Sequence, residues 1–178
     1  RCLDSNELGP TLDALGGVSA TVRLDPAGSV AWLFDRLEAA GATVARADDP
    51  CAAPKAAKNQ VEIAGMRACH IRDGAALTRF IAWVTEAAPK GSIDELTAAK
   101  KAEEFRAQVD DYRDLSFGTI SAAGPNAALP HYSATAQSNH LLKPGTLFLL
   151  DSGCQYPDGT TDVTRTIAIG APTAEHRD

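Results

Sequence analysis

Apolar residues at helical spacing indicate two helices in the middle of the chain. The first is predicted to run to about residue 88 with one apolar stripe, formed by Val61, Ala64, Ala68, Ile71, Ala75, Thr78 and Ala82. Pro89-Lys90-Gly91 ends this pattern. Ser92 and Glu95 then have the spacing of a capping box, which predicts a second helix over residues 93–108.

From residue 115 onward the pattern becomes typical of β-structure. Runs rich in β-formers cover residues 119–122, 146–150 and 163–169, and glycine and proline separate them. Helix stripes and sheet faces must bury one another. Two helices followed by strands therefore predict an α+β domain whose helices cover one face of a mostly antiparallel sheet.

The first part of the chain alternates helical and extended patterns instead. A short helix is expected from Ser5 to Gly16-Gly17, followed by a strand over residues 19–24. A second helix, capped by Ser29 and stopped by Gly41, leads to another strand over residues 43–45. This pattern predicts a small piece of an α/β domain that lacks its beginning.

Residues 48–58 are the best candidate for a linker between domains. Pro50 and Pro54 stand there among small residues. We therefore expect residues 1–54 to be the C-terminal part of an α/β domain, and residues 55–178 to belong to a second domain.

Composition narrows the range of functions. The 178 residues are 44% hydrophobic and 22% charged, as in an ordinary globular protein, and the net charge is −6. This charge balance speaks against nucleic acid and anionic membranes as partners. The chain has no apolar run of the ~18 residues that a membrane span needs and no secretory leader pattern, so a cytoplasmic location is predicted. The four cysteines form no C-x-x-C pair and are expected to be reduced thiols.

Two aspartates flank a predicted hairpin and are the first candidates for chemistry. The β-rich runs on either side of Pro157-Asp158-Gly159 should pair and bring Asp151 nearly opposite Asp162. Directly opposed residues have Cβ atoms ~5 Å apart, and two carboxylates at that distance repel each other. A divalent cation would neutralise them, because hard cations prefer oxygen ligands.

Simpler interpretations of these aspartates remain open. In one of them, Asp151 ends a core strand and pairs with Arg165, which is close in sequence, while Asp162 is a solvated hairpin residue. In this interpretation Asp158 is only a turn former.

A glycine- and proline-containing loop over residues 124–132 presents His131 beside Tyr132. An imidazole near a metal can bind a substrate carbonyl or stabilise developing charge, although a lone loop histidine is more often structural. Other catalytic layouts fit less well. Ser152 lacks the G-x-S-x-G elbow, and Cys154 with His131 as a thiol nucleophile and base has no visible feature that lowers the thiol pKa.

The sequence around these residues resembles the Xaa-Pro aminopeptidases (aminopeptidase P), in the wider group that includes prolidase, creatinase and methionine aminopeptidase. The resemblance is closest over residues 151–166, and it continues in the loop 124–132 and in residues 58–74. It extends from about Lys55 to the end of the chain. The first fifty residues resemble, less distinctly, the end of the domain that precedes the catalytic one.

This resemblance implies the first half of a pita-bread catalytic domain, preceded by the end of a creatinase N-terminal-like domain. In that family two aspartates, one histidine and two glutamates bind two divalent metal ions, commonly manganese, with zinc or cobalt as alternatives. Asp151 and Asp162 match the two aspartates, and His131 matches a histidine that contacts substrate. The implied reaction removes the N-terminal residue from peptides with proline in second position.

The sequence departs from the family in one respect. The family's ligand histidine and glutamates come from later strands, so we expect these ligands to lie beyond Asp178 and the present chain to be inactive alone. Glu175 and His176 are not in the family's positions. The alternatives are a non-catalytic pita-bread module that binds peptides or proteins, and a relative of prolidase or creatinase. A homodimer is a further possibility that the resemblance leaves open.

Overall fold

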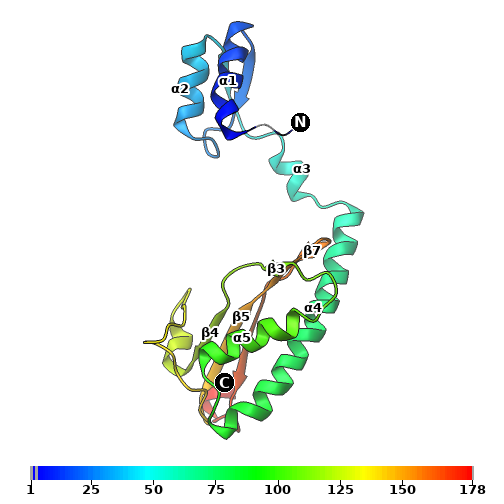
Figure 1. The fold of residues 1–178 in the computed structure, drawn as a ribbon, viewed down its shortest axis with the longest axis vertical. Helices are drawn as coiled ribbons and strands as arrows, with labels where there is room; N and C mark the ends of the chain where they lie inside the picture. The colour runs from blue at the N-terminus through cyan, green and yellow to red at the C-terminus, as the bar shows by residue number, and fades with distance from the viewer. Residues whose placement is uncertain (1, 3, 178) are drawn as a thin grey trace. The chain divides into compact units, whose positions relative to one another are not determined.

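The structure is a computed structural model that describes residue 2 and residues 4–177. It divides into two compact units, one up to Lys58 and one from Asn59 onward, and each has its own apolar core. Figure 1 shows the elements of each unit.

The first unit has the predicted α/β pattern. It contains a 3-10 turn η1 (Ser5–Glu7), helices α1 (Leu8–Gly17), α2 (Ala31–Ala40) and α3 (Ala52–Ala56), and the parallel strands β1 (Thr21–Leu24) and β2 (Thr43–Arg46). Leu12, Leu37 and Ala42 form its buried core. Gly41 ends α2 with φ of 91°, as its position predicts.

Three details of this unit differ from the prediction. Asp4 rather than Ser5 caps the first turn, because its carboxylate accepts a 2.9 Å hydrogen bond from the Asn6 amide. Val30 rather than Ser29 occupies the N-cap of α2, without a side-chain hydrogen bond. The short helix α3 lies inside the predicted linker.

The second unit begins with two helices, α4 (Gln60–Ala87) and α5 (Glu95–Arg106), with a 3-10 turn η2 (Ala88–Lys90) between them. The predicted capping box at Ser92 and Glu95 is wrong. Asp94 caps α5 by accepting a 2.7 Å hydrogen bond from the Thr97 amide, and Glu95 is fully buried. A capping box does occur at the start of α4, between Asn59 and Glu62.

The predicted apolar stripe of α4 is also wrong, because the helix buries a different face. Cys69, Asp73, Ala76, Leu77, Phe80 and Val84 are buried, whereas Val61 and Ile71 are 81% and 75% exposed. Alanines dominate the predicted stripe, and each buries little area. The larger side chains Leu77 and Phe80 decide the orientation.

Two antiparallel sheets complete the second unit. The larger has the order β4-β5-β8, with β4 (Ile120–Ala123), β5 (Leu147–Ser152) and β8 (Val163–Ala168). The smaller has the order β3-β6-β7, with β3 (Asp114–Leu115), β6 (Cys154–Tyr156) and β7 (Gly159–Thr160). There are also two short 3-10 turns: η3 (Gly124–Ala128) follows β4, and η4 (Glu175–Arg177) is the last element of the described chain.

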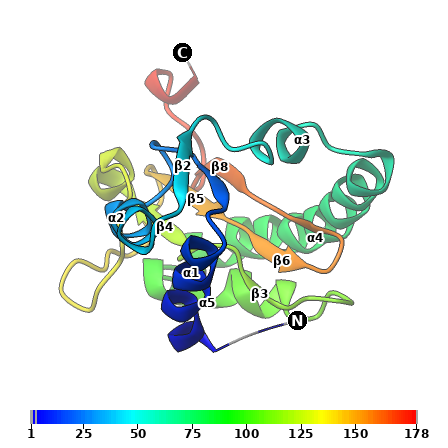
Figure 2. The same cartoon turned by 90° about the horizontal axis from the view of Figure 1, so that it is seen from above.

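One core joins the helices to the larger sheet. It contains Phe80 and Val84 from α4, Ala98 from α5, and Phe148 and Leu150 from β5. Figures 1 and 2 show α4 and α5 together beside these strands. The predicted α+β arrangement, with helices covering one sheet face, is confirmed in the second unit. The other face of β5 is therefore the one available for a functional site.

Candidate metal centre

Strands β5 and β6 turn back at Pro157-Asp158 and return as β7 and β8, which confirms the predicted hairpin. Ser152 pairs with Val163 and Tyr156 with Gly159, so one register runs along the whole hairpin. In this register Asp151 faces Thr164. Asp162 lies two residues before Thr164 and is a diagonal neighbour of Asp151.

The predicted direct opposition of Asp151 and Asp162 therefore needs correction. Diagonal neighbours across a hairpin are roughly 7–8 Å apart, compared with ~5 Å for directly opposed residues. The reason is the two-residue turn, which fixes the register of the paired strands. A gap of this size leaves more room for an ion between the carboxylates than direct opposition would.

Both aspartates belong to the same face of the hairpin. Along the returning strand Thr161 is buried, Asp162 is exposed, Val163 packs against the core and Thr164 is exposed. Phe148, Leu150 and Ser152 of β5 are buried, so Asp151 belongs to the face away from the core.

Asp151 carries an unsatisfied polar atom. Its Oδ1 is buried and has no hydrogen-bond partner among the described residues. A buried carboxylate oxygen without a donor is destabilising by at least ~1–3 kcal/mol, and more when the group is charged. A bound cation would supply the missing partner, so the donor chemistry here fits a metal ion.

The alternative that Arg165 neutralises Asp151 is not supported. Arg165 pairs with Leu150 in the register and therefore belongs to the other face. Its guanidinium donates a 2.8 Å hydrogen bond to the Thr164 carbonyl. Over residues 4–177 no lysine or arginine forms an ion pair with Asp151 or Asp162.

A cavity of about 270 Å³ brings His131 and Asp151 together. Its wall also includes Leu149 and Thr164, and further residues from β4 and from the loop after it: Ile120, Ala122, Ala127, Ala128, Leu129 and Pro130. Asp162 does not line this cavity. Two of the three predicted site residues thus share one pocket, and the third lies diagonally across the hairpin.

His131 has an unusual backbone conformation in this wall. Its φ is 54°, in the left-handed region that few residues other than glycine adopt. Such a conformation persists only where the surroundings enforce it. The loop that carries His131 must therefore be held firmly.

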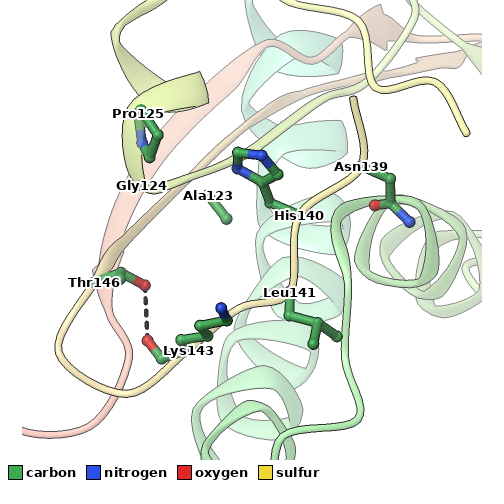
Figure 3. Close-up of a pocket in the computed structure, with 8 residues that line it drawn as sticks. All are labelled: Ala123, Gly124, Pro125, Asn139, His140, Leu141, Lys143 and Thr146. Atoms are coloured by element: carbon green, nitrogen blue, oxygen red, sulfur yellow. Dashed lines mark hydrogen bonds between the residues drawn. The ribbon is translucent and has the colours of Figure 1, made fainter. Parts of the chain in front are cut away.

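A larger cavity, of about 470 Å³, lies at the end of β4 (Figure 3). His140 and Lys143 line it, but Asp151, Asp162 and His131 do not. The candidate site is therefore the smaller cavity.

A buried ion pair behind the hairpin escaped sequence analysis. Asp73 of α4 and Arg106 of α5 are each 1% exposed and form two hydrogen bonds of 2.9 and 3.0 Å. The Tyr156 hydroxyl donates a 3.0 Å bond to the same carboxylate, and burial, with Asp73 nearby, raises the pKa of Tyr156. This network ties both helices to the hairpin that carries the aspartates.

The aspartates alone are an incomplete ligand set. Within the described part of the chain no group of three or more histidine, cysteine, aspartate or glutamate residues could hold a metal ion. Asp151 and Asp162 thus supply two carboxylates, and a stable site needs more ligands.

No helix among the described residues is both long and apolar enough to cross a bilayer.

The comparisons with known proteins all indicate the same family. Residues 64–178 match the model of metallopeptidase family M24. A probable Xaa-Pro aminopeptidase P from Aspergillus flavus is 52% identical over 126 residues, which are 70% of this chain and 19% of that protein. One from Fusarium vanettenii is 44% identical over 149 residues, 83% of this chain and 24% of that protein.

Solved structures agree with this result. The X-prolyl aminopeptidase of Caenorhabditis elegans, described as a cytosolic enzyme with a di-nuclear active site, is 35% identical with a TM-score of 0.79, over 96% of this chain and 28% of that one. The X-Pro aminopeptidase of Thermotoga maritima is 21% identical with a TM-score of 0.73, over 99% and 49%. These matches confirm the predicted pita-bread fold. The chain spans about a fifth to a quarter of the length of the fungal relatives.

Proposed function

Because the chain belongs to metallopeptidase family M24, we propose that it is part of a Xaa-Pro aminopeptidase, which removes the N-terminal residue from peptides with proline in second position. The observation that carries this proposal is the arrangement of Asp151, Asp162 and His131 around one face of the β5–β8 hairpin. The names of the relatives support the substrate class.

Asp151 and Asp162 would hold divalent metal ions. The buried, unpartnered Oδ1 of Asp151 supports this role, and the di-nuclear site described for the nematode enzyme supports a pair of ions. We propose manganese, with zinc and cobalt as alternatives. Parts of the intact protein outside these 178 residues would supply the remaining ligands. A bound ion supplies positive charge that polarises a peptide carbonyl and acidifies a water molecule.

His131 would act beside the metal centre without being a ligand. It lines the cavity that Asp151 also lines, so a peptide bound there would pass within reach of its imidazole. A hydrogen bond from His131 to the scissile carbonyl oxygen would stabilise the charge that develops on that atom. Leu149 and the loop residues Leu129 and Pro130 would provide an apolar wall for the substrate.

We also propose the domain assignment and the location of the intact protein. Residues 1–54 would be the end of a domain that precedes the catalytic one, and residues 55–178 the N-terminal part of the catalytic domain. The division of the chain near Lys58 supports a boundary in this region. A cytoplasmic location agrees with the description of the nematode enzyme as cytosolic.

The test uses the intact protein that contains this segment, loaded with Mn²⁺. It should release the first residue of a Xaa-Pro peptide and leave the matching Xaa-Ala peptide intact. Asp162→Ala should abolish this activity while the protein stays folded, and His131→Ala should reduce turnover more than Mn²⁺ affinity. Asp158→Ala is the matched control, because this acid of the same hairpin pairs with Arg72 at 2.6 Å. Undiminished cleavage by Asp162→Ala would remove the metal assignment.

A further inference from the structure

Glu95 is a fully buried carboxylate at the start of α5, and four hydrogen bonds converge on it. Its Oε1 accepts from the Ala123 amide at 2.7 Å and from the Asn126 side-chain amide at 2.9 Å. Its Oε2 accepts from the Tyr132 hydroxyl at 2.7 Å and from the His140 amide at 3.1 Å. A buried carboxylate with this many donors is well satisfied and strongly held.

These donors are spread along the segment that carries His131. Ala123 ends β4, Asn126 lies in η3, Tyr132 directly follows His131, and His140 lies eight residues further on. Figure 3 shows Ala123 on one side of the larger cavity and His140 and Asn139 on the other. The Glu95 carboxylate thus binds both ends of the segment from Ala123 to His140, and Asn126 and Tyr132 between them.

His131 has no comparable support of its own. Its side chain is exposed, and its ring forms no hydrogen bond within the described part of the chain. The neighbouring Tyr132 is buried, and its hydroxyl lies 2.9 Å from the Asn126 amide nitrogen as well as 2.7 Å from Glu95. Burial raises the pKa of Tyr132, so its hydroxyl stays protonated and can donate to Glu95 at neutral pH.

We propose that Glu95, acting through the Tyr132 hydroxyl, is a positioning residue that sets His131 in the wall of the cavity it shares with Asp151. The carboxylate fixes Tyr132, and Tyr132 fixes the left-handed backbone of its neighbour. The role rests on the proposed function, since it assumes that His131 meets the substrate. Misplacement of such a group by about 1 Å can reduce the rate by about a hundredfold.

The test is a double-mutant cycle in the intact, Mn²⁺-loaded protein. Tyr132→Phe removes one hydroxyl and keeps the buried ring. It should lower kcat by about tenfold to a hundredfold on a Xaa-Pro peptide, while KM and Mn²⁺ affinity change less than about twofold. In the His131→Ala background the same substitution should change kcat by less than about twofold, because it acts through the missing imidazole. A purely structural role would give the same fold-loss in both backgrounds.

Two further variants keep the cycle interpretable. Tyr112→Phe is the control for the loss of a tyrosine hydroxyl. The Tyr112 hydroxyl forms no hydrogen bond within residues 4–177, so this substitution should leave kcat unchanged. Glu95→Gln keeps the side-chain size and replaces one acceptor oxygen by a donor. Like Tyr132→Phe, it should therefore lower kcat. Hydrogen–deuterium exchange should be faster over residues 124–132 in Tyr132→Phe than in the wild type. This measurement reports how firmly the loop is held and does not depend on turnover.

The possible results separate the two proposals. An active wild type with additive losses, or with an unchanged kcat in Tyr132→Phe, overturns the positioning role and leaves the proposed function standing. A wild type that cleaves no Xaa-Pro peptide overturns the proposed function. A His131→Ala variant with full turnover overturns the assignment of His131, and either result removes the positioning role as well.

Discussion

Asp162 lies two residues along the strand from Thr164, the direct partner of Asp151, so the two aspartates are diagonal neighbours on one face of a hairpin. Asp151 is half-buried with an unpartnered Oδ1, whereas Asp162 is exposed. The two carboxylates therefore differ in how strongly they need a cation. Asp151 lacks any partner within the described residues, and Asp162 can be solvated without one.

The hairpin tip packs so closely on α4 that two glycines in the helix should respond in opposite directions. The Asp158 carbonyl oxygen occupies the space that a Cβ on Gly65 would need, whereas nothing lies within 4 Å of a Cβ on Gly74. Gly65→Ala should therefore destabilise the protein by about 1–3 kcal/mol, since the hairpin must shift. Gly74→Ala should stabilise it by about 0.5–1 kcal/mol, as alanine does in a helix interior. Urea unfolding of both variants checks this, and stabilisation by Gly65→Ala would show that the hairpin does not rest on the helix.

Breaking the ion pair between Asp73 and Arg106 should strongly destabilise the second unit. Both side chains are 1% exposed, so Asp73→Ala leaves a buried guanidinium without its partner. We expect a loss of about 3–5 kcal/mol in the free energy of unfolding. Tyr156→Phe keeps the pair and removes one hydrogen bond to it, and should lose about 1 kcal/mol. Similar losses in the two variants would contradict the leading role of the ion pair.

Local signals predicted the hairpin but not its register. Pro157-Asp158-Gly159 between two β-rich runs is a short-range turn signal, and the structure turns there. Which residues face each other depends on the number of residues in the turn, and a shift of two positions separates direct from diagonal neighbours. The sequence therefore located Asp151 and Asp162 on one hairpin without giving their spacing.

Long-range partners explain the other failures. Asp73 belongs to the buried face of α4 only because Arg106, 33 residues away, neutralises it, and nothing near Asp73 indicates this. Glu95 had the spacing of a capping residue, yet its partners Tyr132 and His140 lie 37 and 45 residues away. Glu95 was thus predicted to be a capping residue, and no structural role was predicted for Asp73.

The four cysteines should divide into two reactive and two protected thiols. Cys2 and Cys51 are exposed, and Cys69 and Cys154 are buried. Burial raises the pKa of the Cys154 thiol to about 12, so its thiolate fraction at pH 7 is on the order of one in 10⁵. Of these four cysteines, iodoacetamide at pH 8 should label Cys2 and Cys51 in the native protein and all four after denaturation. Rapid native labelling of Cys154 would reopen its role as a nucleophile.

The cap of α5 should give stability that acid removes. Hydrogen bonds from Thr97 hold the pKa of the Asp94 carboxyl below its usual value. The lowered folded-state pKa means that this contribution is present above the unfolded pKa of about 3.9 and is lost as the pH falls through the folded value. Asp94→Ala should lose about 1 kcal/mol at pH 7. The difference from wild type should shrink below pH 4.

Asp94→Asn is the control for charge, because it keeps an oxygen acceptor for the Thr97 amide. It should retain most of the stability at pH 7 and lose the acid dependence of this site. A constant difference between wild type and Asp94→Ala from pH 7 to pH 2 would contradict the role of the ionised carboxylate.

The most direct test of the metal assignment is anomalous scattering from crystals of the intact protein grown with Mn²⁺. We predict manganese peaks within coordination distance of the Asp151 and Asp162 carboxylates, with Asp151 Oδ1 as a ligand. A map without manganese at Asp151, or one in which a guanidinium contacts that carboxylate instead, would contradict the account.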